Sequence, residues 1–123
     1  MNTKQKGNIA VGLAIAYYTS EGCTVSIPLN DSQDYDLVVD IDGFLNKVQV
    51  KYTSEKAESG YYKVGLRSIS GSSKLSYKTV PNTDIDYLFI VTANRDQYIV
   101  PLLDITTVSC ITLNDKLEQY KIL

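Results

Sequence analysis

The sequence of 123 residues contains no histidine, only two cysteines and no run of 18 apolar residues. Without an imidazole side chain, the Ser-His-Asp triad, the Cys-His dyad, HNH-type nuclease sites and His-ligated zinc are excluded. Cys23 and Cys110 lie in apolar stretches and form no CxxC pair, which favours buried free thiols in a reducing compartment. The chemistry that remains belongs to carboxylates, lysines and metal ions.

Features of a membrane or secreted protein are also missing. Residues 1–7 are polar and precede a stretch with helical period, whereas a signal peptide has an apolar core at this point. Hydrophobic residues make up 44% of the chain and charged residues 21%, as in one globular domain. We therefore expect a single domain over residues 1–123, located in the cytoplasm and without a membrane partner.

The formal net charge of -2 argues against a nucleic-acid partner when it is taken as an average. The charges are nevertheless segregated, because residues 31–43 contain five aspartates, whereas residues 44–80 contain seven basic side chains against two glutamates. This basic segment also contains tyrosines and serines, a composition typical of surfaces that contact phosphates and base edges. The candidate DNA-binding residues are Lys47, Lys56, Lys63, Arg67, Lys74 and Lys78. Scattered lysines of a solvated loop are the alternative interpretation.

Hydrophobic periodicity predicts one amphipathic helix followed by a series of strands. The helix is expected over residues 5–21, and strands are expected over 24–28, 36–41, 44–53, 61–67, 86–92, 97–100 and 109–113. Residues 68–73 are expected to form a flexible connector, residues 102–108 a short helical turn and the C-terminus a frayed tail. This order predicts an α/β or α+β fold with the helix on one face of a sheet.

The pair Asp42-Gly43 predicts a type I′ hairpin turn in which residue i pairs with residue 85 − i. This register places Asp36 opposite Gln49, and Lys51 shares the strand face of Gln49. A carboxylate and an amide oxygen suit Mg²⁺ or Mn²⁺, and a nearby lysine can stabilise a charged phosphoryl group or help to deprotonate water. The patch fits metal-assisted phosphodiester hydrolysis, although alternating polar residues are also ordinary on a half-exposed strand.

Gly7, Gly22, Pro28, the Tyr-Asp-Leu-Val of residues 35–38 and above all the Val-Gln-Val-Lys of residues 48–51 resemble the PD-(D/E)XK nuclease superfamily. The likeness is strongest to its bacterial intron-encoded homing endonucleases, in which glutamine replaces the second acid, and it extends over nearly the full chain. The resemblance implies a restriction-endonuclease-like core, with an N-terminal helix packed on a mixed sheet that has hairpin extensions. It also implies a sequence-specific, metal-dependent double-strand DNA endonuclease of the homing type.

By this resemblance Asp36 is the metal-binding acid, Gln49 is a metal ligand and Lys51 is the catalytic lysine. The backbone carbonyl of Val50 is implied as a further ligand. The family places one more carboxylate on the first helix, where this chain has Val11. Since an apolar side chain cannot bind a metal ion, the alternative is a DNA-binding protein of the same fold with weakened or lost cleavage. A junction resolvase or repair nuclease, which recognises DNA shape, is a third possibility.

Cleavage of both strands of a long site requires two active sites, so we expect a homo-oligomer, a dimer or a tetramer. One candidate interface is the face of the first helix with small residues, which are Ala10, Gly12, Ala14 and Ala16. The other is the apolar C-terminal set Leu102, Leu103, Ile105, Val108 and Ile111. Burial in the core of the monomer is the alternative for both, and for most of these residues we favour it.

Overall fold

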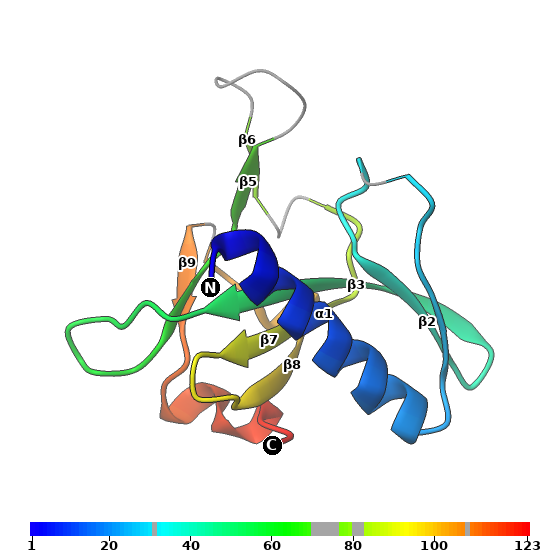
Figure 1. The fold of residues 1–123 in the computed structure, drawn as a ribbon. Coiled ribbons are helices and arrows are strands. Elements are labelled where there is room, and N and C mark those ends of the chain that lie inside the picture. Colours follow the sequence, from blue (N-terminus) through cyan, green and yellow to red (C-terminus); the bar gives the residue numbers. More distant parts are fainter. Residues whose placement is uncertain (31, 70–76, 80–82, 108) are drawn as a thin grey trace.

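The structure is a computed structural model that describes residues 1–30, 32–69, 77–79, 83–107 and 109–123. An N-terminal helix, α1 (Thr3–Ser20), packs across a five-stranded sheet (Figure 1). The sheet strands are β1 (Thr24–Ser26), β2 (Leu37–Ile41), β3 (Phe44–Thr53), β7 (Tyr87–Thr92) and β8 (Gln97–Pro101). Their spatial order is β1-β2-β3-β7-β8, in which β3 and β7 are parallel and the other neighbours are antiparallel. The predicted fold class, a helix on a mixed sheet, is confirmed.

A capping box sets the start of α1. The Asn2 side chain accepts the backbone N–H of Gln5, and the Gln5 side chain accepts that of Asn2, both at 2.9 Å. Because these bonds satisfy donors that a helix start leaves unpaired, the helix begins two residues before the expected position 5. It ends at Ser20 rather than 21, and Gly22 follows with a φ of 84°.

The sheet separates two apolar clusters. On the α1 side, Ala10 and Ala14 are fully buried against Val48 and Phe89. Ala10 and Ala14 therefore belong to the core, as the alternative interpretation held, while Gly12 and Ala16 remain exposed. The opposite cluster contains Leu88, Ile90, Val64, Leu66 and Tyr98. Alternation along β7 explains both clusters, since successive side chains of a strand point to opposite faces.

The Asp42-Gly43 turn has the predicted form. Asp42 has a φ of 52° and Gly43 a φ of 89°, which are the positive values that a type I′ turn requires. Strands β2 and β3 pair from Leu37 with Val48 to Ile41 with Phe44. The expected register, in which paired positions sum to 85, is therefore confirmed.

The single strand expected over 61–67 is wrong, because the segment divides between two partners. β4 (Lys63–Gly65) pairs with β9 (Cys110–Thr112), and β5 (Arg67–Ile69) pairs with β6 (Tyr77–Thr79). Ser68 and Ile69 thus belong to a strand rather than to the connector, and residues 70–73 lie outside the described ranges. Of these two small sheets, β5 and β6 form a hairpin extension that projects from the body (Figure 1), whereas β4 and β9 come from distant parts of the chain.

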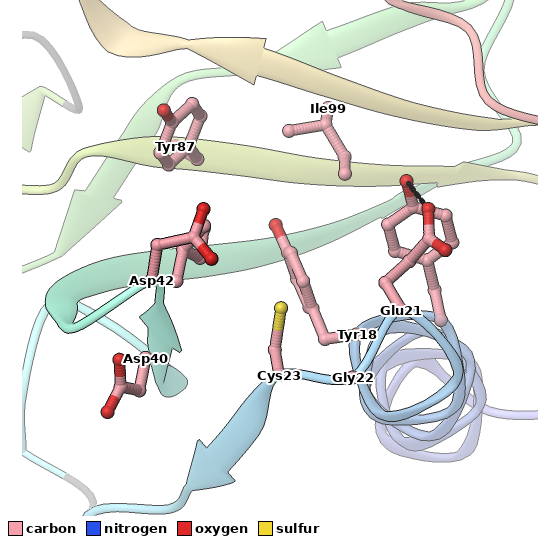
Figure 2. Close-up of a pocket in the computed structure, with 10 residues that line it drawn as sticks. Tyr18, Glu21, Gly22, Cys23, Asp40, Asp42, Tyr87 and Ile99 are labelled. Carbon is pink, nitrogen blue, oxygen red and sulfur yellow. Dashed lines mark hydrogen bonds between the residues drawn. The ribbon is translucent and has the colours of Figure 1, made fainter.

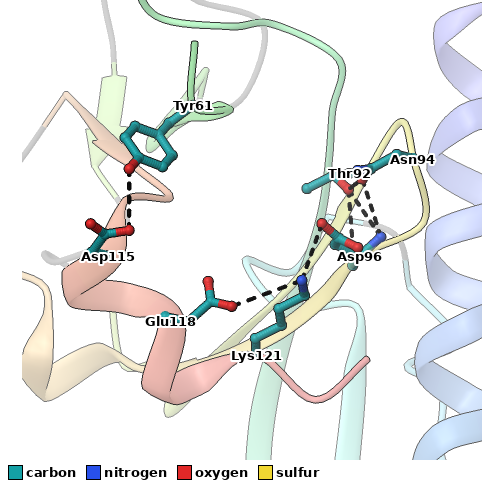
Figure 3. Close-up of polar contacts among 7 residues, drawn as sticks. All are labelled: Tyr61, Thr92, Asn94, Asp96, Asp115, Glu118 and Lys121. Carbon is teal, nitrogen blue, oxygen red and sulfur yellow. Dashed lines mark hydrogen bonds and ion pairs between the residues drawn. The ribbon is translucent and has the colours of Figure 1, made fainter. Parts of the chain in front are cut away.

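The frayed C-terminal tail is also wrong, because side-chain contacts hold this segment in place (Figure 3). The 3-10 helix η3 (Asp115–Tyr120) follows β9, and Asp115 accepts a hydrogen bond from the Tyr61 hydroxyl at 3.1 Å. Lys121 then pairs with Asp96 at 3.5 Å and Glu118 at 3.9 Å. Backbone bonds between Gln97 and residues 122–123 cover the edge of β8.

The remaining predictions for the C-terminal half are met in part. A 3-10 turn, η2 (Leu102–Asp104), occupies the start of the expected helical turn 102–108. Of the apolar C-terminal residues, Ile105 is buried, Leu102 and Ile111 are half-buried, Leu103 is exposed, and Val108 lies outside the described ranges. Both cysteines are free, but Cys23 is only half-buried and Cys110, on the two-stranded sheet of β4 and β9, is exposed. Among the described residues, we find no helical segment with the length and hydropathy of a membrane span.

Candidate active site

Asp36 is held against β3 by two hydrogen bonds. Its backbone N–H donates to the Val48 carbonyl at 2.9 Å, and its carboxylate accepts the Val50 N–H at 2.7 Å. Burial raises the pKa of the Asp36 carboxyl, while the Val50 N–H and the charge of Lys51 act in the opposite direction. The carboxylate is therefore fixed in position and partly removed from water, with one oxygen already engaged.

Lys51 directly follows Val50 on β3 and is close enough to Asp36 for their charges to interact. Burial lowers the pKa of the Lys51 ammonium, and the charge of Asp36 offsets part of this effect. The pKa values of this acid and this base are thus displaced toward each other. Such displaced pairs are common where a protein performs chemistry, although structural ion pairs produce them too.

The two polar atoms of the Gln49 side-chain amide differ in their hydrogen bonding. Its Nε2 donates to the Asp34 carbonyl at 2.9 Å, which fixes the amide plane. Its Oε1 is buried and has no hydrogen-bond partner among the described residues. A buried acceptor without a partner is costly, and a carbonyl-type oxygen is a ligand that hard divalent cations prefer. Gln49 and Asp36 therefore form a donor set that fits Mg²⁺ or Mn²⁺.

This donor set contains few carboxylates. Within the described ranges, no group of three or more Asp, Glu, His or Cys side chains could hold a metal ion. Val11, which stands where the resemblance implies a further acid, is half-buried and packs against the apolar cluster under α1. Gln49 and Lys51 alternate with Val48 and Val50, so they point away from this cluster. Val11 thus packs against the core beneath the helix.

An open pocket of about 350 Å³ extends from Lys51 to the first turn of α1. Its walls include Lys6, Gly7, Lys63 and Tyr52. The Lys6 ammonium lies 5.9 Å from the centre of the Tyr52 ring, and Lys63 pairs with Glu55 at 3.1 Å. Three lysines and the positive end of the helix dipole therefore meet one carboxylate, Glu55, at this pocket, and the excess of positive charge suits an anionic ligand such as a phosphate.

Sequence reasoning missed Lys6 because it treated the polar N-terminus only as the start of a helix. The signal that could have found it is a basic residue in the first turn of a helix, directly before Gly7. Residues in the first turn of a helix commonly have acidic side chains that complement the dipole, whereas α1 has none there.

The predicted DNA-binding residues have different surroundings. Lys47 pairs with Asp84, which raises the pKa of the Lys47 ammonium, and it lies over the Tyr35 ring at 5.4 Å. Lys56 is exposed, with its ammonium 5.1 Å from the centre of the Tyr62 ring. Among the predicted DNA-binding residues whose side chains the structure describes, Lys63 alone shares a pocket with Lys51. Arg67 and Lys78 belong to the projecting β5–β6 hairpin, their side chains are not described, and Lys74 lies outside the described ranges.

The comparisons with known proteins agree with this geometry. A family model described as PD-(D/E)XK endonuclease matches residues 1–120. The chain belongs to the PD-(D/E)XK endonuclease family. Among solved structures, it is similar to a bacterial homing endonuclease, I-Ssp6803I, at 30% sequence identity and a TM-score of 0.80, covering 98% of this chain and 89% of that chain. No curated protein matches the sequence. The resemblance inferred from residues 35–38 and 48–51 is confirmed, and with it the restriction-endonuclease-like fold.

Proposed function

We propose that this PD-(D/E)XK protein is a metal-dependent, sequence-specific endonuclease that cuts double-stranded DNA in the manner of intron homing enzymes. The observation that best supports the proposal is the buried Oε1 of Gln49, which has no hydrogen-bond partner among the described residues and belongs to the residue two positions before Lys51 on β3, where the charges of Lys51 and Asp36 interact. Membership of an endonuclease family and the likeness to a bacterial homing endonuclease add to it. The proposal takes residues 1–123 as one domain that acts in the bacterial cytoplasm.

Asp36, the Gln49 amide oxygen and the Val50 carbonyl would hold Mg²⁺ or Mn²⁺, as family membership implies. Such an ion, when bound, polarises a phosphoryl oxygen and lowers the pKa of water. Lys51 would stabilise the negative charge that develops on the phosphoryl group or accept a proton from the attacking water.

The DNA backbone would follow the basic surface that begins at the Lys51 pocket. The proposed contacts are Lys47, Lys56, Lys63, Arg67, Lys74 and Lys78. Lys47 and Lys63 are expected to contribute less than an unpaired lysine, since their charges are already paired with Asp84 and Glu55. A homo-oligomer, either a dimer or a tetramer, would supply the second active site that double-strand cleavage requires.

A pool of plasmids with random duplex inserts, incubated with Mg²⁺, tests the proposal. We expect cleavage at a defined sequence, products with 5′-phosphates and complete loss of cleavage in EDTA. Lys51→Ala should reduce the rate by about 10²–10³-fold. Lys116→Ala, which removes an exposed lysine on η3, is the matched control and should cut normally. Undiminished cleavage by Lys51→Ala would overturn the assignment of this site.

The second candidate function is DNA binding on the same fold with weakened cleavage, and the apolar packing of Val11 favours it. With Val11 and a neutral Gln49, Asp36 is the single anionic ligand of the proposed set, so metal affinity should be low. Val11→Glu separates the two candidates when the variant and the parent chain are compared on the same bound DNA. A gain in Mg²⁺-dependent cutting supports the weakened form. An unchanged rate in a variant that remains folded by circular dichroism rejects it.

A further inference from the structure

A second pocket, of about 450 Å³, lies at the opposite end of α1 and outside the site described above (Figure 2). Three tyrosines, Tyr17, Tyr18 and Tyr87, form much of its wall together with the side chain of Ile99. The remaining lining comes from the residues that directly follow α1 and from the end of β2 with the β2–β3 turn. The pocket is therefore both aromatic and apolar along its sides.

Tyr18 leaves a polar atom unsatisfied inside this pocket. The residue is only 4% exposed, and its hydroxyl has no hydrogen-bond partner among the described residues. Contacts with Tyr17 and Phe89, at 5.4 and 5.8 Å between ring centres, fix the ring. Figure 2 shows the hydroxyl directed into the space between Asp42, Tyr87 and Ile99. Burial raises the pKa of the Tyr18 phenol, so the group stays neutral and can accept a hydrogen bond.

The charge of the pocket is negative. Glu21, Asp40 and Asp42 line it, and no lysine or arginine is among its described lining residues. Glu21 accepts a hydrogen bond from the Tyr17 hydroxyl at 3.2 Å, and Asp40 accepts the Gly43 N–H at 2.9 Å. The carboxylate of Asp42 faces the Tyr18 hydroxyl across the pocket (Figure 2). The C-terminal end of α1 adds the negative pole of the helix dipole, which favours a cation.

A bare metal ion does not suit these walls. No group of three or more metal-ligating side chains was found within the described ranges. Two of the three lining carboxylates, Glu21 and Asp40, already accept hydrogen bonds, and the aromatic faces and Ile99 add no oxygen ligands for a hard cation. An ammonium group on a methylene chain suits them better. Its N–H groups can reach the Tyr18 oxygen and the Asp42 carboxylate, while the methylenes contact Tyr87 and Ile99.

We infer that this pocket binds an organic cation, a primary alkyl ammonium compound such as a short diamine. The Tyr18 hydroxyl accepts a hydrogen bond from the ammonium, and Asp42 balances its charge. This site is separate from the Asp36 and Lys51 site, so its occupancy does not depend on nuclease activity.

Titration of the full chain with putrescine, followed by calorimetry and by NMR of the tyrosine side chains at about 150 mM NaCl, tests the inference. We expect saturable binding to the parent chain and about tenfold weaker binding to Tyr18→Phe and to Asp42→Asn. Tyr18→Phe keeps the ring and removes only an unpaired hydroxyl, so its Tm should equal or exceed that of the parent chain.

Glu58→Gln is the control, because it removes one negative charge from an exposed loop outside the pocket. Its affinity for putrescine should stay within about twofold of the parent value. Equal weakening by Asp42→Asn and Glu58→Gln would show general charge attraction and overturn the inference. Unchanged affinity in Tyr18→Phe, or no binding of putrescine to the parent chain, would overturn it as well.

Discussion

The two ends of α1 differ in the charge that surrounds them. At the N-terminal end, Lys6, Lys51 and Lys63 line one pocket, whereas Glu21 and Asp42 line the pocket at the C-terminal end. The helix dipole has the same sign as the side chains at each end, since its N-terminal pole is positive and its C-terminal pole negative. One helix thus separates a surface suited to phosphates from a surface suited to cations.

This separation explains why the net charge of -2 is a poor guide to function. The acidic and basic residues cancel in the sum but occupy different parts of the molecule. The sequence already divides them between residues 31–43 and 44–80, and the structure adds Lys6 to the basic side and Glu21 to the acidic side. Ligand binding depends on the local field at each pocket rather than on the average.

The largest effect is expected from reversing the charge of Lys6, because this change reduces the difference in charge between the two ends of α1. Lys6→Glu puts an anion beside Lys51 and toward the DNA phosphates, so we expect about tenfold weaker DNA binding at about 150 mM salt. The slope of log affinity against log salt should also fall by about 1. Fluorescence anisotropy with a labelled duplex measures both quantities.

The matched control is Lys116→Glu, which makes the same charge change on an exposed residue of η3. It should alter DNA affinity by less than about threefold. Equal losses in the two variants would mean that Lys6 acts only through the net charge, and the N-terminal pocket would have no special role.

The buried carboxyl of Asp36 is expected to have a smaller effect, on the stability of the protein, and this effect depends on pH. Because burial raises the pKa of Asp36, the native state holds this proton more tightly than the unfolded chain. The stabilising contribution is therefore complete below the unfolded value of 3.8 and is lost as the pH rises through the raised native pKa. At neutral pH the buried negative charge of Asp36 lowers the free energy of unfolding, even though the charge of Lys51 offsets part of this effect.

Asp36→Asn removes this cost and leaves an oxygen that can accept the Val50 N–H. In the metal-free protein, we expect it to raise the free energy of unfolding at about pH 7 by an amount on the order of 1 kcal/mol. The gain should vanish near pH 3, where the parent carboxyl is protonated in both states. Urea unfolding at both pH values measures the difference, and a loss of stability at neutral pH would contradict the assigned cause of the pKa shift.

Short sequence motifs predicted those parts of the fold that residues close together in the sequence determine. The Asp42-Gly43 turn determined the register of β2 and β3, because the pair adopts the positive φ values of a type I′ turn. That register places Asp36 beside β3, where its carboxylate accepts the Val50 N–H. The relative positions of Asp36 and Lys51 could thus be predicted, while the roles of Asp36, Gln49 and Lys51 stay predictions.

Features that depend on distant partners could not be predicted in this way. The division of residues 61–67 follows from the pairing of β4 with β9, which lies far along the chain, while β5 pairs with the next strand, β6. The ion pair between Lys47 and Asp84 spans 37 positions, so no local pattern marks Lys47 as engaged. The Tyr18 pocket needs the end of α1 and the β2–β3 turn to meet, which only the tertiary structure determines.

The most direct test of the central claim is the single-turnover cleavage rate of Lys51→Ala on DNA that the variant has already bound. Pre-formed complexes started with Mg²⁺ separate the chemical step from binding. We predict that the variant binds DNA within about threefold of the parent affinity but cuts about 10²–10³-fold more slowly. A parent chain that cuts with Mg²⁺, together with a Lys51→Ala variant that cuts at the same rate, would contradict the account.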